Sequence, residues 1–172
     1  MATFFAALLK TPRLLRTRRN HALEHASIYG LTARNPRRMV AGHSDAGGFW
    51  LLGELNTEEV RQAVDEAMRR LRAGEHWLAV HPNCGTNLMT AASLTGLAGG
   101  LAMRGANRRG GLLERLPLAI LFSVFALIAA RPLGARLQER ITTSSDLGPL
   151  EVIDIRRSQR GQFTAHRVET RS

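Results

Sequence analysis

The segment SDAGGFWLLGELNTEEVRQAVDEAMRRLRAG, residues 44–74, decides the fold because its periodicity changes from that of strands to that of a helix. Its Ser-Asp-Ala-Gly-Gly turn lies between two short strand-like runs, residues 38–43 and 49–55, which predicts an antiparallel hairpin. Asn56 then has the character of a helix N-cap, with acidic residues in the first turn and apolar residues at three- and four-residue steps up to Gly74.

The flanking segments extend this unit. Residues 12–31 have helical periodicity, and Gly30 followed by Asn35-Pro36 is expected to end that helix. Three further runs are typical of strands, and these are residues 76–81, 150–156 and 163–168. The last two are expected to complete the sheet begun upstream. We therefore predict an α+β fold with a small mixed or antiparallel sheet and two helices.

Two uncharged stretches, residues 88–103 and 116–130, follow this domain. Each is shorter than the roughly 20 residues that span a bilayer, although neighbouring leucines and arginines can extend the second. Ala92, Gly96 and Gly100 form a row of small residues that allows close helix packing. The pattern predicts a transmembrane helical hairpin, and the alternative is a buried helix pair in a soluble core.

Four segments follow from these patterns. They are an interfacial amphipathic segment (1–16), an α+β domain (17–87), a transmembrane hairpin (88–131) and a C-terminal β-hairpin tail that packs on the α+β domain (132–172). A hairpin returns the chain to its starting side, so the domain and the tail are expected to share a compartment. The N-terminal charges follow the apolar run, unlike those of a secretory signal, which favours the cytoplasm. Arginines on both sides of the hairpin weaken the positive-inside signal.

The net charge of +10 comes almost entirely from arginine, and Lys10 is the only lysine. The arginine clusters are spread along the chain without interleaved aromatic residues, which argues against nucleic acid as a partner. Membrane phosphates are the anionic neighbours that this pattern favours. The predicted partners are therefore a lipid membrane and a protein partner or peptide substrate.

The helix at residues 12–31 contains the first candidate site. His21 and His25 are four residues apart, so a helix places both imidazoles on one face, where they can chelate a divalent ion. The spacing H-x-x-E-H resembles the inverted zincin motif of the pitrilysin-like peptidases, which implies zinc binding by the histidines and activation of water by Glu24. The alternative is that the histidines are structural and that Glu24 pairs with Arg18 or Arg19.

The segment HPNCGTN, residues 81–87, contains the second candidate site. His81 and Cys84 are three residues apart and are good zinc ligands. Together with His21 and His25 they supply four nitrogen and sulfur donors. Such a site is structural if all four bind, and catalytic if water takes one position.

Cys84 also has two other interpretations. It is the single cysteine, so no internal disulfide forms, and its position before an expected helix favours the thiolate. It is then a candidate nucleophile, with His81 or His25 taking its proton and the N–H groups of Gly85 and Thr86 facing an oxyanion. In the alternative interpretation the segment is only a tight strand-to-helix turn, in which Asn83 or Thr86 is the N-cap. Lone histidines elsewhere favour structural roles, and these are His43, His76 and His166.

Three stretches, RRNHALEHASIYGL, GGFWLLGELNTEEVRQAVDEAMRRLRAGE and LAVHPNCGTNL, resemble a family of small bacterial membrane proteins catalogued as a domain of unknown function. The resemblance covers roughly residues 17–130. It implies the architecture and assigns no activity.

Three functions are compatible with the sequence. The first is a membrane-anchored zinc-dependent hydrolase of the peptidase type, with Glu24 as general base and His21, His25 and His81 or Cys84 as ligands. The second is a non-catalytic membrane subunit or scaffold with a structural His/Cys site. The third is a thiol enzyme that uses Cys84.

Overall fold

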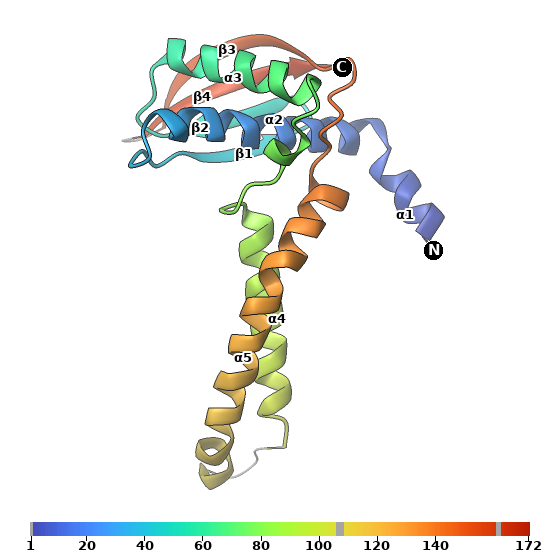
Figure 1. The fold of residues 1–172 in the computed structure, drawn as a ribbon, viewed down its shortest axis with the longest axis vertical. Coiled ribbons are helices and arrows are strands. Elements are labelled where there is room, and N and C mark those ends of the chain that lie inside the picture. Colours follow the sequence, from blue (N-terminus) through green and yellow to red (C-terminus); the bar gives the residue numbers. More distant parts are fainter. Residues whose placement is uncertain (1, 106–108, 161–162) are drawn as a thin grey trace. The chain divides into compact units, whose positions relative to one another are not determined.

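The computed structural model of the chain describes residues 2–105, 109–160 and 163–172. The chain divides into two compact units, whose elements are labelled in Figure 1. The first unit consists of Met1–His81 and Glu139–Ser172, and the second is Pro82–Gln138.

The first unit contains a four-stranded sheet in its described part. The strands are β1 (Ala41–Asp45), β2 (Gly48–Leu52), β3 (Glu151–Arg160) and β4 (Phe163–Arg171), in the order β1-β2-β4-β3. Every pairing is antiparallel, and the pairing of β2 with β4 sets Trp50 opposite Arg167. The expectation that the C-terminal strands complete the sheet begun upstream is therefore confirmed.

Two helices, α2 (Pro12–Arg34) and α3 (Thr57–Arg72), cover one face of this sheet (Figure 1). Phe49 and Leu51 on β2 share a face with Val168 on β4, because residues two apart in a strand point the same way. All three side chains are fully buried in the core. The fully buried apolar residues of the two helices are Ala22, Leu23, Leu31, Val60 and Val64. The predicted α+β fold is confirmed, and its sheet is antiparallel throughout.

The start of α3 follows the predicted capping pattern. The Asn56 side chain accepts a hydrogen bond from the N–H of Glu58 at 2.8 Å, and the Glu59 carboxylate accepts one from the N–H of Asn56 at 3.4 Å. These bonds satisfy N–H groups that the first helical turn leaves unpaired. The helix ends before Gly74, whose φ of 95° lies in the left-handed region that glycine adopts readily.

The prediction that residues 76–81 form a strand is wrong. His76–Ala79 form a short 3-10 helix, η1, in which the N–H of Leu78 donates to the carbonyl of Glu75 at 3.1 Å. Leu78 and Ala79 are both buried although they are adjacent in the sequence. A strand would turn these neighbours to opposite faces, whereas one helical turn buries both against α2 and α3.

Two boundaries also differ from the sequence expectations. α2 continues through Gly30 to Arg34 and ends at Asn35, because Pro36 disfavours a helical residue before it. Gly30 lies at the contact with α3, where a Cβ would be 3.6 Å from that of Ala63. The first strand lies at Ala41–Asp45 rather than at residues 38–43. Before α2, the chain forms a separate short helix, α1 (Ala2–Leu9).

The second unit is a helical hairpin, in which α4 (Gly85–Ala102) and α5 (Arg109–Leu137) run side by side and antiparallel (Figure 1). Small and hydroxyl side chains line their contact. A Cβ on Gly99 would lie 3.1 Å from Ser123 Oγ, and this hydroxyl donates to the carbonyl of Thr95 at 3.4 Å. The small-residue row at Ala92, Gly96 and Gly100 does not make this contact, since the latter two have no described atom within 4 Å of an added Cβ.

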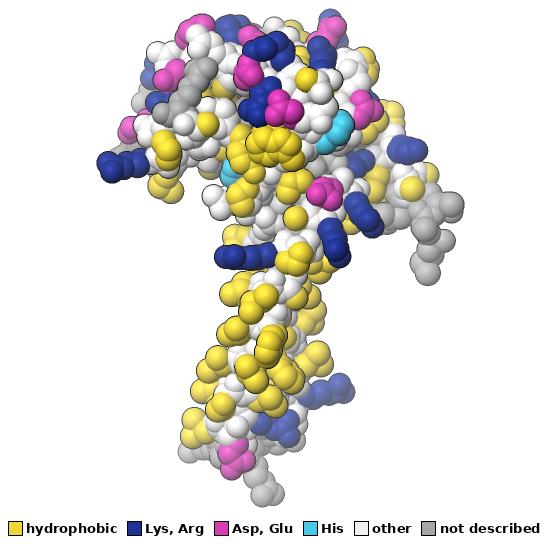
Figure 2. Space-filling view, viewed as in Figure 1, with side chains coloured by type: hydrophobic (Ala, Val, Ile, Leu, Met, Phe, Trp, Pro, Cys, Tyr) yellow, Lys and Arg dark blue, Asp and Glu magenta, His cyan; other side chains and the backbone are white. Residues whose placement is uncertain are grey.

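Large apolar side chains cover the surface of this hairpin (Figure 2). Ile120, Phe125 and Ile128 on α5 are each more than half exposed. Among the described residues, one helical segment, Gly111–Thr142, is long and apolar enough to cross a membrane, with a mean hydropathy of 2.0 in its most apolar window. At its end, α5 continues as a π-helical turn, η2 (Gln138–Thr142).

Candidate metal centre

His21 and His25 are stacked on α2, with their ring centroids 4.3 Å apart. Nδ1 of His21 lies 3.0 Å from the carbonyl oxygen of Thr142, and Nδ1 of His25 lies 2.7 Å from that of Ala79. A carbonyl oxygen only accepts hydrogen bonds, so each Nδ1 carries the proton and donates. In the neutral imidazoles the metal-binding lone pair is therefore on Nε2. Backbone carbonyls fix metal-binding histidines in other proteins in the same way.

A third imidazole lies next to this pair. The ring centroid of His81 is 5.7 Å from that of His25 and 4.8 Å from that of Tyr29. The Tyr29 hydroxyl donates to the carbonyl of Val80 at 2.9 Å, and this bond ties the residues that follow η1 to α2. Burial, and then the charge of His25, lower the pKa of His81 to about 4. His81 is therefore a neutral imidazole at physiological pH, the form that binds metals.

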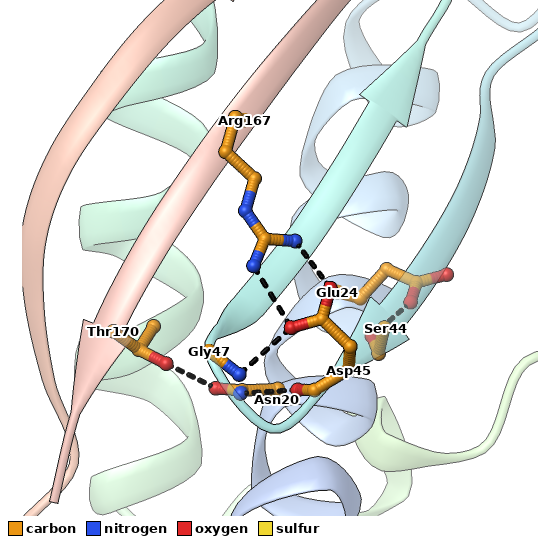
Figure 3. A network of polar contacts seen from close by, with 7 residues as sticks. All are labelled: Asn20, Glu24, Ser44, Asp45, Gly47, Arg167 and Thr170. Carbon is orange, nitrogen blue, oxygen red and sulfur yellow. Dashed lines mark hydrogen bonds and ion pairs between the residues drawn. The ribbon is translucent and has the colours of Figure 1, made fainter.

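Glu24 is a residue of α2, and its side chain faces β1. Its side chain is 4% exposed, and its carboxylate accepts a hydrogen bond from the hydroxyl of Ser44 (Figure 3). A Cβ on Gly42 would overlap the same carboxylate, so a larger residue at this position on β1 would force the Glu24 side chain to move. Burial raises the pKa of Glu24, and the Ser44 hydrogen bond and the charges of His21 and His43 oppose that shift.

The interpretation that pairs Glu24 with Arg18 or Arg19 is wrong. The Arg18 guanidinium donates to the carbonyls of Arg140 at 3.1 Å and Thr143 at 2.8 Å. Arg19 Nε donates to the carbonyl of Asp146 at 3.0 Å. Both arginines thus hold α2 against η2 and the residues that follow it, and the carbonyl of Thr142, the last residue of η2, orients His21.

A buried polar network fixes the rotation of α2 above the sheet (Figure 3). Asn20 is fully buried, donates to the carbonyl of Asp45 at 2.8 Å, and accepts from the Thr170 hydroxyl at 2.7 Å. Asp45 in turn accepts two hydrogen bonds from Arg167, each 2.8 Å long. These bonds tie the residue before His21 to β1 and β4.

Sequence reasoning missed Asn20 and Ser44 as supports of the site. Asn20 could have been noticed, because it is a polar residue next to His21 within a helix that otherwise reads as amphipathic. Ser44 gave no such signal, since serine is ordinary in a predicted turn.

Cys84 belongs to the second unit, where it is the N-cap of α4. Its sulfur accepts the N–H of Thr86 at 3.4 Å, so the expectation that Asn83 or Thr86 is the cap is wrong. By donor chemistry, His21, His25 and Cys84 are a set that could hold a metal ion. The ligand roles of His81 and Cys84 stay predictions from the sequence.

These features define an α+β protein with a helical hairpin and a histidine-rich candidate metal centre. The chain belongs to the family described as Domain of unknown function (DUF6391), whose profile matches residues 16–155. It is also similar to an uncharacterized protein of Picosynechococcus sp. (strain ATCC 27264 / PCC 7002 / PR-6), with 38% identity over 149 residues that cover 78% of this chain and 69% of the relative. No solved structure matches the chain. The predicted membership of an uncharacterised family is confirmed.

Proposed function

We propose that this protein is a membrane-anchored metal-binding protein whose ion is held by His21 and His25. The observation that carries the proposal is the pair of hydrogen bonds from Nδ1 of these residues to backbone carbonyls, at 3.0 and 2.7 Å. They select the tautomer with the lone pair on Nε2 in two stacked rings of one helix. Mixed imidazole and thiolate donors favour zinc.

His81 and Cys84 are proposed to complete the ligand set. The neutral ring of His81 lies beside that of His25. Cys84 follows His81 by three residues, so the chain keeps their Cα atoms within about 11 Å of each other. Four such donors form a closed structural site, and three leave a position for water.

Anchoring in a membrane is proposed for the α4–α5 hairpin. Between residues 116 and 130, the exposed faces of α5 are apolar, and no described residue of the second unit buries Phe125 or Ile128. Lipid is the solvent in which such a surface is stable. We propose that both ends of the hairpin are on the cytoplasmic side, together with the first unit.

Metal analysis of the purified full chain tests the proposed centre. We expect about one zinc ion per chain in the wild type, in line with one mononuclear site. His25→Ala and Cys84→Ala should each lower the zinc content, because each removes a donor. The matched control is His76→Ala, which removes an exposed histidine of η1 and should keep the metal. A wild-type protein that stays metal-free after incubation with zinc would contradict the proposal.

A second candidate, a zinc-dependent hydrolase acting on peptides, is favoured by the position of Glu24. Its buried carboxyl has a raised pKa and is near enough to His21 to be affected by that residue's charge. A carboxylate of this kind is suited to take a proton from a metal-bound water. Glu24→Gln should then retain zinc and lose cleavage of a fluorogenic peptide mixture, whereas zinc retention without any wild-type cleavage supports a non-catalytic subunit or scaffold.

The hydrogen bond from Thr86 to the Cys84 sulfur favours the third function, a thiol enzyme. Iodoacetamide distinguishes it from the metal site. A zinc-bound Cys84 should be protected until a chelator is added. Fast labelling of a metal-free wild type would instead identify a reactive thiol.

A further inference from the structure

The charged side chains at the junction of α1 and α2 are all cationic, and none of them belongs to the candidate metal centre. The chain turns there, with the N–H groups of Lys10 and Thr11 donating to the carbonyls of Ala7 and Leu8, each at 3.1 Å. α2 then begins at Pro12. Residues 1–23 contain five Lys and Arg residues and no Asp or Glu.

These five cations fall into two groups. Arg18 and Arg19 are engaged inside the first unit, where they donate to backbone carbonyls. Lys10, Arg13 and Arg16 make no ion pair within the described residues 2–105, 109–160 and 163–172. Lys10 and Arg13 are exposed, and Arg16 has a buried Nε without a hydrogen-bond partner in that part of the chain. Lys10, Arg13 and the exposed part of the half-buried Arg16 side chain are therefore available to an external anion.

Apolar surface lies next to the second group of cations. α1 has the sequence ATFFAALL, which contains no charged residue. Leu8 is 43% exposed and Leu14 is 40% exposed. A helix of eight residues is only marginally stable alone in water, so an apolar phase that covers α1 would stabilise it.

We propose that the α1–α2 junction, defined by Leu8, Lys10, Arg13, Leu14 and Arg16, binds the surface of a bilayer that contains anionic lipids. The leucines enter the headgroup region, and the three cations pair with lipid phosphates. A lipid surface fits because it offers an apolar layer and a dense anionic layer within a few ångströms of each other. This inference rests on the proposed membrane anchoring and names the lipid class that the first unit recognises.

The test uses the full chain with Leu8→Trp, reconstituted in nanodiscs of brominated phosphatidylcholine with or without brominated phosphatidylglycerol. Bromine quenches an indole that enters the bilayer, and the unsubstituted chain gives the baseline for Trp50 and Trp77. We expect extra quenching at position 8 in the anionic discs. High salt should reduce it, since salt screens pairs of exposed charges.

Two triple variants establish which cations are responsible. Lys10→Gln with Arg13→Gln and Arg16→Gln should return the quenching to baseline. Arg37→Gln with Arg61→Gln and Arg69→Gln changes the net charge equally at exposed sites elsewhere and should have no effect. Lys10→Arg with Arg13→Lys and Arg16→Lys should keep the full signal, and circular dichroism checks that each variant folds.

Equal quenching in the two lipid compositions, or an equal loss in both Gln triples, would overturn the inference. Flotation of the same samples after carbonate extraction tests the anchoring separately. A chain that fails to float disproves the anchoring of the hairpin. A chain that floats without anionic quenching disproves only the role of the α1–α2 junction.

Discussion

α3 and α5 place their apolar residues in opposite ways. On α3, Val60 and Val64 are fully buried under arginines and glutamates that occupy the solvent side. On α5, Phe125 and Ile128 are more than 60% exposed, and polar residues do not form an opposite face. The surface of α3 matches water on one side and a protein core on the other. The surface of α5 does not have this two-sided pattern, and the proposed membrane anchoring would place it in lipid.

The largest expected difference between the two units comes from removing one phenyl ring. Phe49→Ala should lower the free energy of unfolding of the first unit by about 3–5 kcal/mol, because the side chain is fully buried in the core. Phe125→Ala should leave that unfolding unchanged. Tryptophan fluorescence during urea unfolding measures it specifically, since Trp50 and Trp77 both belong to the first unit. Equal destabilisation by the two substitutions would break the comparison.

Introducing a charge should affect the two helices in the reverse order, with a large effect on membrane insertion from α5 and none from α3. Phe125→Arg should disfavour membrane insertion by about 2.5–3.5 kcal/mol, since it places a cation in the middle of the apolar surface. Gln62→Arg on the exposed face of α3 should have no effect on insertion. The fraction of each chain that resists carbonate extraction measures this. Unchanged insertion of the Phe125→Arg chain would contradict the proposed anchoring.

Each unit also has a polar anchor, and the two anchors should act independently. Asn20→Ala should destabilise the first unit by about 1–3 kcal/mol, because it leaves the Asp45 carbonyl and the Thr170 hydroxyl without their partner. Asn87→Ala removes the acceptor of a 2.8 Å hydrogen bond from Gln138 in the second unit. Thermal unfolding followed by tryptophan fluorescence should respond to the first substitution and not to the second.

The smallest expected effect is a pH dependence confined to the first unit. His166 is fully buried on β4 with Nε2 3.0 Å from Thr57 Oγ1, and burial followed by the charge of Arg157 lowers its pKa. The native state thus binds this proton less readily than the unfolded chain, so stability falls as the pH drops below about 6.5, by at most about 1.4 kcal/mol per pH unit. Residues 82–138 contain no histidine.

Comparison of the wild type with His166→Leu isolates this contribution. The difference in unfolding free energy between the two chains should change between about pH 7 and pH 5 and should be constant above that range. A difference that is constant throughout would show that His166 does not resist protonation in the native state.

Much of the fold was predictable because several local sequence signals indicate the same element. The Asn56 cap, the acidic first turn and the apolar stripe of α3 all indicate the same helix, and the structure contains it. The turn before Phe49 likewise gave the β1–β2 hairpin. Residues 76–81 misled because their apolar character fits either a strand or a helical turn. Only the position of Leu78 and Ala79 between α2 and α3 decides between them.

The histidines of the candidate site were predictable from the sequence, whereas the groups that orient them were not. The spacing of His21 and His25 needs only a helix, and a helix is what formed. The carbonyls that orient them come from Ala79 and Thr142, which are 54 and 121 residues away in sequence from their respective partners. The alternative that pairs Glu24 with Arg18 or Arg19 failed for a related reason, because its hydrogen-bond partner Ser44 lies on a strand that only the tertiary fold brings against α2.

The strand order of the sheet has a consequence for biosynthesis. β4 pairs with β2 on one side and β3 on the other, so the edge of β2 lacks its neighbour until residues 163–171 leave the ribosome. By then the entire α4–α5 hairpin has been translated. A chain that stops after the hairpin would expose an unpaired strand edge and the Phe49 face of the core, both of which promote aggregation and recognition by chaperones and proteases. Pairing of β4 with β2 thus closes this edge of the sheet only after the hairpin has been translated.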